Sequence, residues 1–342
     1  MAMGESSVTD RNHDLKEELA NLPTMGVRIA IAPDMAIEGV GRPTDVSIGP
    51  LRERVARAVE RGGGQVTPLD EADGLVWLLP GGPGPLLEVL DAHPDLRWVQ
   101  LPWAGVEHFT AAFAYPQTFT CAKGSYAKQV SEHALMLALA CLRDLVRHAR
   151  APHWNPIDPR SLGGLNVTIL GGGGIASELV GLLRPFGCHV RVLRRTATPL
   201  DGADETLAIS ALHSVLPTTD VLVVALALTP ETRHIVGAPE FALLPPGAVL
   251  VNVARGPHVD TDALLQAIDT GALTAAGLDV TDPEPLPDDH PLWRRDQVLI
   301  TSHCADSSEY VATMLCERVT ENVRRFAAGD TLVGQVDPTV GY

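Results

Sequence analysis

Basic residues are in short supply in this chain. Its 342 residues include 26 Lys and Arg against 42 Asp and Glu, for a formal net charge of −16 at pH 7. Phosphate backbones and anionic lipid repel such a protein, so we expect neither nucleic acid nor a membrane surface as a partner. If the substrate is itself an anion, the few arginines must be concentrated at its binding site.

Cysteine is also scarce. The chain has five, widely spaced and without a C-x-x-C pair, which predicts neither a disulfide framework nor a metal site. No apolar run is long enough to span a bilayer. Residues 1–24 are polar, lack the apolar stretch of a signal peptide, and are predicted to be a flexible N-terminal segment. We therefore expect a cytoplasmic globular protein.

Aromatic residues make up only 4% of the chain, whereas hydrophobic residues make up 45%. Cores built from Val, Leu and Ala are typical of parallel α/β sheets. The length fits two domains better than one. The composition therefore favours an α/β protein with two cores.

Short apolar runs alternate with helical patterns along most of the chain, as in parallel sheets. In the first part, strands are predicted to start at Val27, Gly74 and Arg97, with a helix over 48–61. In the second part, six strands are predicted over 167–170, 189–193, 220–225, 248–253, 275–279 and 298–301. Two long helices are predicted over 127–148 and 305–328. Six strands in this rhythm suit a doubly wound, Rossmann-type dinucleotide-binding sheet.

A glycine-rich turn follows the first strand of that second series. The pattern G-x-G-x-x-A is formed by Gly171, Gly173 and Ala176. The first glycine permits a tight turn, the second lets the backbone approach a pyrophosphate, and the alanine lets the helix pack closely. Gly174 and Ile175 would then present backbone N–H groups and the positive end of the helix dipole to the phosphates.

The next strand ends in Arg194, Arg195 and Thr196. NAD-binding domains place an acid there to bind the ribose 2′-hydroxyl, and this chain has none. Arginine pairs with phosphate through two hydrogen bonds, so these residues favour the 2′-phosphate of NADP. The alternative is a pair of solvated arginines after a strand, and NAD remains open as the cofactor.

Three functional side chains follow three further predicted strands: Arg255, Glu284 and His303. In an open α/β sheet the carboxyl ends of the strands line the ligand crevice, so the three can converge there. Singly, each has a plain interpretation as a capping arginine, a loop carboxylate or a structural histidine. Their joint occurrence in this order favours a catalytic set.

With these motifs the chain resembles the D-isomer-specific 2-hydroxyacid dehydrogenase family. The matching stretches are the G-x-G-x-x-A turn, N-V-A-R-G at 252–256, G-L-D-V at 277–280, P-E-P at 283–285, H-P-L-W at 290–293 and T-S-H-C-A at 301–305. The resemblance implies two doubly wound domains. One is a Rossmann cofactor domain over 126–308, and the other is a flavodoxin-like, discontinuous substrate domain over 25–125 and 309–342. It also implies a homodimer formed through the cofactor domain.

The resemblance, together with the chemistry of a 2-keto acid, implies roles for the site residues. Arg255 is expected to hold the substrate carboxylate, and His303 to protonate the carbonyl oxygen as hydride arrives from the nicotinamide. Glu284 is expected to orient the imidazole and stabilise its positive charge. The remaining positions are implied as substrate contacts (Trp103, Ala104, Gly105) and as cofactor contacts (Leu226, Val253, Ala254, Asp279, Ala305).

The predicted function is therefore D-specific hydride transfer between NAD(P)H and a small 2-keto or 2-hydroxy acid. The sequence does not identify the acid. Trp103 and Trp77 are candidates to shape the substrate pocket, and His133 is assigned to packing. The chain departs from many relatives at Ser302, where Pro is common, and at Asp306, where Gly is commoner. One alternative is a cofactor-sensing scaffold without turnover. Another is a formate- or phosphite-type enzyme, but the formate pattern has an amide at the position of Glu284.

Overall fold

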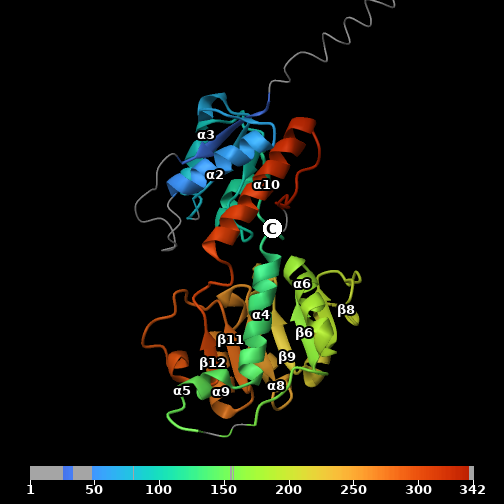
Figure 1. Ribbon diagram of the computed structural model, residues 1–342. Coiled ribbons are helices and arrows are strands. Elements are labelled where there is room, and N and C mark those ends of the chain that lie inside the picture. Colours follow the sequence, from blue (N-terminus) through green and yellow to red (C-terminus); the bar gives the residue numbers. More distant parts are fainter. Residues whose placement is uncertain (1–25, 34–47, 80, 155, 157, 339–342) are drawn as a thin grey trace, which may run out of the picture.

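The computed structural model describes residues 26–33, 48–79, 81–154, 156 and 158–338. The segment 1–24, predicted to be flexible, lies outside the described residues. The described helices and strands form two lobes, each built around a parallel sheet (Figure 1). The fold is α/β, as the alternating sequence pattern predicted.

The first lobe contains a five-stranded parallel sheet with the order β2-β1-β3-β4-β5. This is the flavodoxin-like order, which has its switch point between β1 and β3. The strands are β1 (Arg28–Ala32), β2 (Gln65–Val66), β3 (Gly74–Trp77), β4 (Trp98–Gln100) and β5 (Thr118–Thr120). The helices that pack with this sheet are α2 (Ile48–Arg61), α3 (Gly84–Ala92) and α10 (Ser308–Ala328).

The second lobe contains a seven-stranded parallel sheet with the order β12-β11-β10-β9-β6-β7-β8. The six predicted strands are present as β6 (Asn166–Leu170), β7 (His189–Arg194), β9 (Val221–Val224), β10 (Val249–Asn252), β11 (Ala275–Leu278) and β12 (Val298–Ile300). The helices of this lobe are α4 (Ala127–Leu142), α5 (Leu145–Arg150), α6 (Gly174–Leu183), α7 (Leu212–Val215), α8 (Ala238–Leu243) and α9 (Thr261–Thr270).

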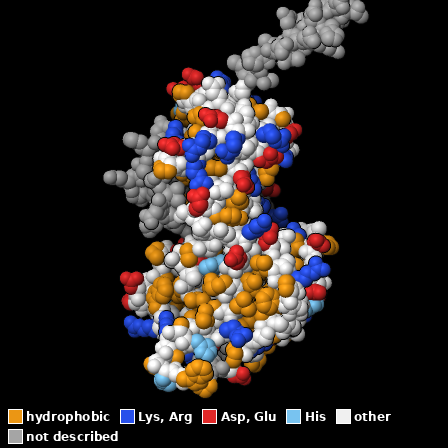
Figure 2. All heavy atoms as spheres, viewed as in Figure 1, with side chains coloured by type: hydrophobic (Ala, Val, Ile, Leu, Met, Phe, Trp, Pro, Cys, Tyr) orange, Lys and Arg blue, Asp and Glu red, His pale blue; other side chains and the backbone are white. Residues whose placement is uncertain are grey.

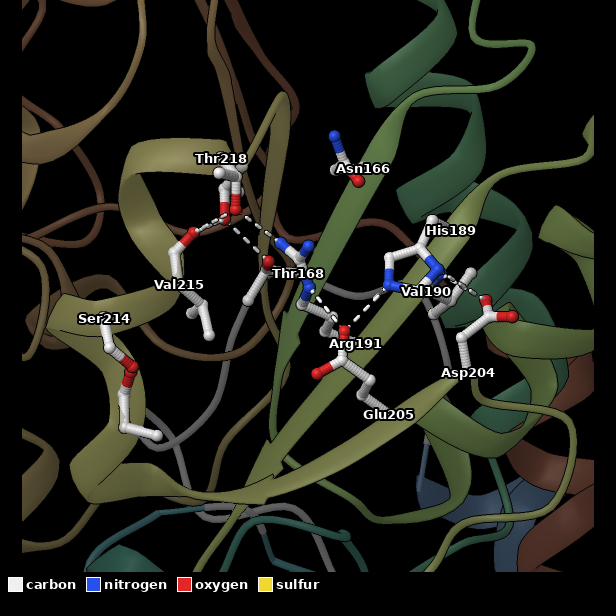
Figure 3. A network of polar contacts seen from close by, with 12 residues as sticks. Asn166, Thr168, His189, Val190, Arg191, Asp204, Glu205, Ser214, Val215 and Thr218 are labelled. Carbon is white, nitrogen blue, oxygen red and sulfur yellow. Dashed lines mark hydrogen bonds and ion pairs between the residues drawn. The ribbon is translucent and has the colours of Figure 1, made fainter.

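The seventh strand, β8 (Glu205–Ala208), corrects the expectation of six. It is short, partly exposed and polar at its start, so it carries no apolar signal. Polar contacts hold it to β7 (Figure 3). Glu205 accepts hydrogen bonds from Arg191 Nε at 3.0 Å and pairs with His189 Nε2 at 2.8 Å, while Arg191 Nη1 donates to Thr218 Oγ1 at 2.8 Å.

The central strands of the second sheet are buried on both faces, as expected where helices cover a parallel sheet. All four residues of β9, β10 and β11 are buried. Successive side chains point to opposite faces, so Val249 and Val251 join the core beneath α4 and α6, whereas Leu250 joins the core beneath α8 and α9. The sheet is thereby fixed between two aliphatic layers.

The helix predicted over 127–148 is two helices. Asp144 adopts a left-handed conformation (φ 52°) between α4 and α5. Asp is one of the residues that tolerate this conformation, and one such residue is enough to end a helix. The second long helix starts at Ser308, later than the predicted 305, because the Ser307 hydroxyl accepts from the Tyr310 amide at 3.3 Å as an N-cap.

The chain returns to the first lobe at its end. In Figure 1 the red helix α10 lies beside the blue helix α2, far away in the sequence. Leu315, Val319 and Val323 of α10 share a core with Ile29 and Val55. The chain therefore passes between the lobes twice, once before α4 and once before α10.

Trp77 does not shape a pocket, contrary to the sequence expectation. Its side chain is 2% exposed and lies in a core with Leu75, Leu79 and Leu86. The expectation placed Trp77 beside a loop facing the site, but Trp77 is the last residue of β3, which is buried throughout.

Candidate active site

The glycine-rich turn joins β6 to α6. Gly171 has φ 113°, and a Cβ there would overlap the Ala225 carbonyl oxygen, so only glycine fits. Gly173 is the N-cap of α6, and nothing lies within 4 Å of where its Cβ would be. Ala176 is fully buried. The open space over the first N–H groups of a helix fits a dinucleotide pyrophosphate, with Gly174 and Ile175 in the first turn.

The basic residues after β7 lie next to this turn. A Cβ on Gly172 would be 2.7 Å from Cδ of Arg194, so the Arg194 side chain lies against the glycine turn. Arg195 and Thr196 are exposed just beyond it. The structure thus places the Arg194 side chain beside the turn, near where the adenosine ribose of a dinucleotide would lie.

His303 and Glu284 form a direct pair. They follow the adjacent strands β12 and β11, and His303 Nδ1 lies 2.7 Å from Glu284 Oε1. The side chains are 24% and 33% exposed, so the pair is accessible without being fully solvated. His303 has the left-handed φ of 51°. With Nδ1 engaged by a carboxylate, the ring carries its other nitrogen, Nε2, on the opposite side.

Arg255 follows β10, the strand next to β11, and meets the first lobe. Its Nε donates to Glu107 Oε1 at 2.5 Å, and its Nη1 donates to the Ala254 carbonyl at 2.7 Å. A Cβ on Gly105 would overlap Nη2 of Arg255, so the predicted substrate loop closely approaches the guanidinium. Burial raises the pKa of Glu107, but the charge and hydrogen bond of Arg255 outweigh burial and lower it overall. Glu107 is therefore a carboxylate.

Side chains absent from the sequence prediction fix the Arg255 backbone. Asn252 Nδ2 donates to the Arg255 carbonyl at 2.9 Å. His258 is fully buried, accepts from the Arg255 amide at 3.2 Å through Nδ1, and has Nε2 3.2 Å from the Ala227 carbonyl. Burial lowers the pKa of His258 more than these backbone contacts raise it, so the ring is neutral, with one donor and one acceptor nitrogen.

Asp279 is 2% exposed and accepts several hydrogen bonds. Its Oδ1 accepts from Thr301 Oγ1 at 2.6 Å and from the Cys304 amide at 2.9 Å, and its Oδ2 accepts from the Ala305 amide at 3.3 Å. Burial raises the pKa of Asp279, but hydrogen bonds led by His133 and Thr301 outweigh burial and bring it to about 2. Much of this carboxylate is thus engaged by the protein itself.

His133, assigned to packing from the sequence, also makes polar contacts beneath the site. Its Nε2 lies 2.9 Å from Thr301 Oγ1 and 3.3 Å from Asp279 Oδ1. In the sequence, His133 is only a histidine on a predicted helix. Nothing there indicates a partner more than a hundred residues away.

The other predicted residues lie at the same edge of the second sheet or on the facing loop. Leu226 follows β9 and is partly buried, Val253 and Ala254 follow β10 and are buried, and Ala305 follows His303 and is partly buried. Trp103 and Ala104 are partly buried in the loop after β4. The structure brings Gly105 close to Arg255, and Glu284 close to His303. Glu284 and His303 follow the neighbouring strands β11 and β12.

In the part of the chain that the structure describes, no group of three or more His, Cys, Asp or Glu side chains is arranged to hold a metal ion. None of its helices combines the length and apolarity that crossing a bilayer requires.

The doubly wound sheet and its glycine-rich turn are those of a dinucleotide-binding enzyme. The NAD binding domain of the D-isomer specific 2-hydroxyacid dehydrogenases matches residues 134–305, and the chain belongs to this family. This is a family of NAD(P)-dependent oxidoreductases that act on 2-hydroxy acids.

Similar proteins agree with this assignment. An uncharacterised protein of Corynebacterium melassecola is 36% identical over 85% of this chain and 97% of its own length. Glyoxylate/hydroxypyruvate reductase A of Serratia proteamaculans is 36% identical over 63% of this chain and 69% of its own. The crystal structure of a D-isomer specific 2-hydroxyacid dehydrogenase from Xanthobacter autotrophicus, in complex with NADPH and MES, is 28% identical, with a TM-score of 0.77 over 93% of this chain and 100% of that one.

Proposed function

We propose that the protein is a D-specific 2-keto acid reductase in which His303 is the acid/base, Glu284 its partner and Arg255 the group that binds the substrate carboxylate. The observation that carries the proposal is the 2.7 Å contact between His303 Nδ1 and Glu284 Oε1. These residues follow β12 and β11, and β11 is next to β10, the strand that precedes Arg255. A carboxylate on Nδ1 stabilises the charged ring, so that Nε2 carries a proton to donate.

Each residue has a defined task in the reduction. A bound nicotinamide supplies the hydride for the carbonyl carbon. His303 donates the Nε2 proton to the carbonyl oxygen, and Glu284 holds the ring in place before and after the transfer. Arg255 binds the substrate carboxylate and polarises the neighbouring carbonyl. In the oxidative direction His303 takes the hydroxyl proton back.

The loop of Trp103, Ala104 and Gly105 completes the proposed substrate site. Gly105 has no side chain, which allows its backbone to lie against the Arg255 guanidinium. Glu107 in the same segment already occupies Nε of Arg255, so the substrate carboxylate would use the Nη groups. This arrangement gives a small anionic acid one guanidinium edge together with the adjacent backbone.

NADP is the proposed preferred cofactor, with NAD as the weaker one. The support is Arg194 against the glycine turn, with Arg195 and Thr196 exposed beyond it. The relative from Xanthobacter autotrophicus was crystallised with NADPH. Further cofactor contacts are proposed for Gly171, Gly173, Gly174, Ile175, Leu226, Val253, Ala254, Asp279 and Ala305.

The proposed substrates are small 2-keto acids such as glyoxylate and hydroxypyruvate. A relative 36% identical to this chain is named a glyoxylate/hydroxypyruvate reductase. We assign the substrate domain to 25–125 and 309–342 and the cofactor domain to 126–308, with 1–24 as a leading segment. The two cores of each lobe support this division.

A homodimer through the cofactor domain is also proposed. Figure 2 shows hydrophobic side chains gathered over α4 and its surroundings on the second lobe. The exposed large hydrophobic residues of this lobe include Met136, Leu145, Leu182 and Phe186. Exposed apolar surface of this kind is typical of an interface between subunits.

The test is oxidation of NADPH and NADH, followed by absorbance in parallel reactions with a panel of 2-keto acids. We expect turnover with at least one small acid, faster with NADPH. Binding of cofactor without turnover on any acid would overturn the proposal and favour a cofactor-sensing scaffold.

A further inference from the structure

A line of hydrogen bonds runs from helix α4, which follows the first crossover, through Thr301 to Asp279. His133 Nε2 lies 2.9 Å from Thr301 Oγ1, and Thr301 Oγ1 lies 2.6 Å from Asp279 Oδ1. The side chains of His133 and Asp279 are 14% and 2% exposed. These contacts are therefore shielded from water, where hydrogen bonds hold geometry best.

The donor and acceptor of each of these hydrogen bonds follow from the number of hydrogens that each group carries. Asp279 is ionised and can only accept, so the single hydroxyl hydrogen of Thr301 points to Asp279. The Thr301 oxygen is then an acceptor for its other neighbour. His133 must therefore carry a hydrogen on Nε2 and donate it to Thr301.

Asp279 in turn holds the turn that carries the catalytic histidine. Its backbone carbonyl accepts from the His303 amide at 2.8 Å. Its carboxylate accepts from the next two amides, those of Cys304 and Ala305, at 2.9 and 3.3 Å. His303 has a φ of 51°, which residues other than glycine rarely adopt, so the turn depends on such bonds.

The same helix reaches the substrate loop. Tyr126, the N-cap of α4, donates its hydroxyl to the Pro102 carbonyl at 3.1 Å, immediately before Trp103. Tyr126 and His133 are seven residues apart, close to two helical turns, and so lie on one face of α4. One helix with its N-cap thus contacts the loop on the first lobe directly and the turn of His303 on the second lobe through Thr301 and Asp279.

We propose that His133 is a positioning residue, which acts through Thr301 and Asp279 to hold His303 in register with the substrate loop. This inference rests on the proposed role of His303 as the acid/base. It also gives Asp279 a task within the protein, beyond its family-implied contact with the nicotinamide. A misplacement of about 1 Å in a catalytic group is enough to cost about 100-fold in rate.

The test compares His133→Leu with His133→Gln. Leucine removes the donor, whereas the glutamine amide nitrogen reaches about as far as Nε2 and can donate to Thr301. For His133→Leu we expect kcat to fall by about tenfold to 100-fold, with NADPH Kd changed less than about twofold. His133→Gln should recover most of the loss. Thr301→Val should behave like His133→Leu, and Thr301→Ser like the wild type.

Amide hydrogen exchange supplies a readout that does not depend on turnover. In His133→Leu, exchange should accelerate at the amides of Cys304 and Ala305 and stay unchanged in distant strands. Thr168→Val is the matched control, because it removes a buried hydroxyl of the same sheet, 2.7 Å from Thr219 Oγ1 and outside the site. It should leave both kcat and exchange at 304–305 unaltered.

Two outcomes would overturn the inference. One is wild-type kcat and exchange in His133→Leu. The other is an equal loss in the leucine and glutamine variants with faster exchange throughout the lobe, which indicates a purely structural role. If the wild type reduces no keto acid but exchange at 304–305 still depends on a donor at 133, the proposed function fails while the positioning role stands.

Discussion

At the scale of single residues, two carboxylates of the candidate site pair with two different nitrogen groups. Glu284 faces an imidazole and Glu107 faces a guanidinium. In the proposed mechanism, the first contact stabilises the proton that His303 donates to the substrate. The second partly neutralises the guanidinium charge that binds the substrate carboxylate. We therefore expect the two carboxylates to affect different kinetic constants.

Glu284→Gln retains an acceptor for His303 Nδ1 but removes the charge that stabilises the protonated ring. We expect kcat for keto acid reduction to fall by about 100-fold or more, because general acid catalysis contributes on that scale. NADPH binding, followed by fluorescence titration, should be unchanged. His303→Ala should abolish reduction and still bind cofactor. A wild-type kcat in Glu284→Gln, or turnover retained in His303→Ala, would remove that residue from the mechanism.

Glu107→Gln leaves an acceptor for Nε of Arg255 and removes a negative charge beside it. The guanidinium should then attract the anionic substrate more strongly, so we expect KM for the keto acid to fall several-fold with a smaller change in kcat. Steady-state kinetics at low ionic strength measures this effect, which salt should weaken. A higher KM would mean that Glu107 orients Arg255 more than it competes for it.

Ionisation of the Asp306 side chain destabilises the folded protein. Its Oδ1 is buried without a hydrogen-bond partner among the described residues. Burial first, and then the Asp279 carboxylate, raise the pKa of Asp306 from the ordinary 3.8 to about 6. Below pH 3.8 Asp306 is protonated in both the folded and the unfolded chain. Between pH 3.8 and 6 it is ionised in the unfolded chain but still protonated in the folded one. The free energy of unfolding therefore falls as the pH rises through this range.

Asp306→Asn should therefore raise the melting temperature by a few degrees at pH 7.5, where the full cost is present, and by less at pH 4.5. Differential scanning calorimetry at the two pH values measures this. Asp288→Asn, on an exposed loop, is the control and should change neither value. An equal gain at both pH values would show that ionisation of Asp306 is not the cause.

At the scale of elements, the turn after β7 is proposed to set the preference between NADPH and NADH. If Arg194 and Arg195 bind the 2′-phosphate, replacing both with Gln should raise KM for NADPH by about tenfold to 100-fold and leave that for NADH within about threefold. Kinetics with both cofactors on one keto acid gives the ratio. Arg184→Gln, on the short turn after α6, is a basic control away from β7. Equal effects on the two cofactors would contradict the assignment.

The predictability of elements followed their apolar content. Strands β6, β9 and β10 were readable because buried parallel strands are continuous aliphatic runs. Strands β2, β5 and β8 were missed, because they are two to four residues long and carry polar side chains. The break at Asp144 was missed because a single left-handed residue leaves no periodic signal.

Site residues that lie in short sequence motifs could be predicted from the sequence. Arg255, Glu284 and His303 lie in recognisable stretches after strands, and the pairing of Glu284 with His303 was predicted and is present. Glu107, His133 and His258 were not predicted. Two of them meet partners more than a hundred residues away, and the third acts on a neighbouring backbone amide. Such contacts exist only once the lobes and sheets are assembled.

At the scale of the whole molecule, two parts with separate cores meet at a site to which both contribute. Arg255 of the second lobe contacts Glu107 and lies against Gly105 of the first. Helices α4 and α10 follow the two crossovers, and each has residues packed against the second-lobe core. Any interface that holds α4 in place would therefore also steady the site.

The proposed dimer makes this connection testable. Met136→Arg combined with Leu182→Arg places charges on exposed apolar positions of α4 and α6, which pack on each other. We expect a monomer at micromolar concentration by light scattering, because unpaired charges in an apolar interface are costly. Glu88→Arg, on the exposed side of α3, should leave the oligomeric state unchanged. Since α4 carries His133 and Tyr126, the monomer should also have a lower kcat. A monomeric wild type, or a double variant that stays dimeric, would rule out this face as the interface.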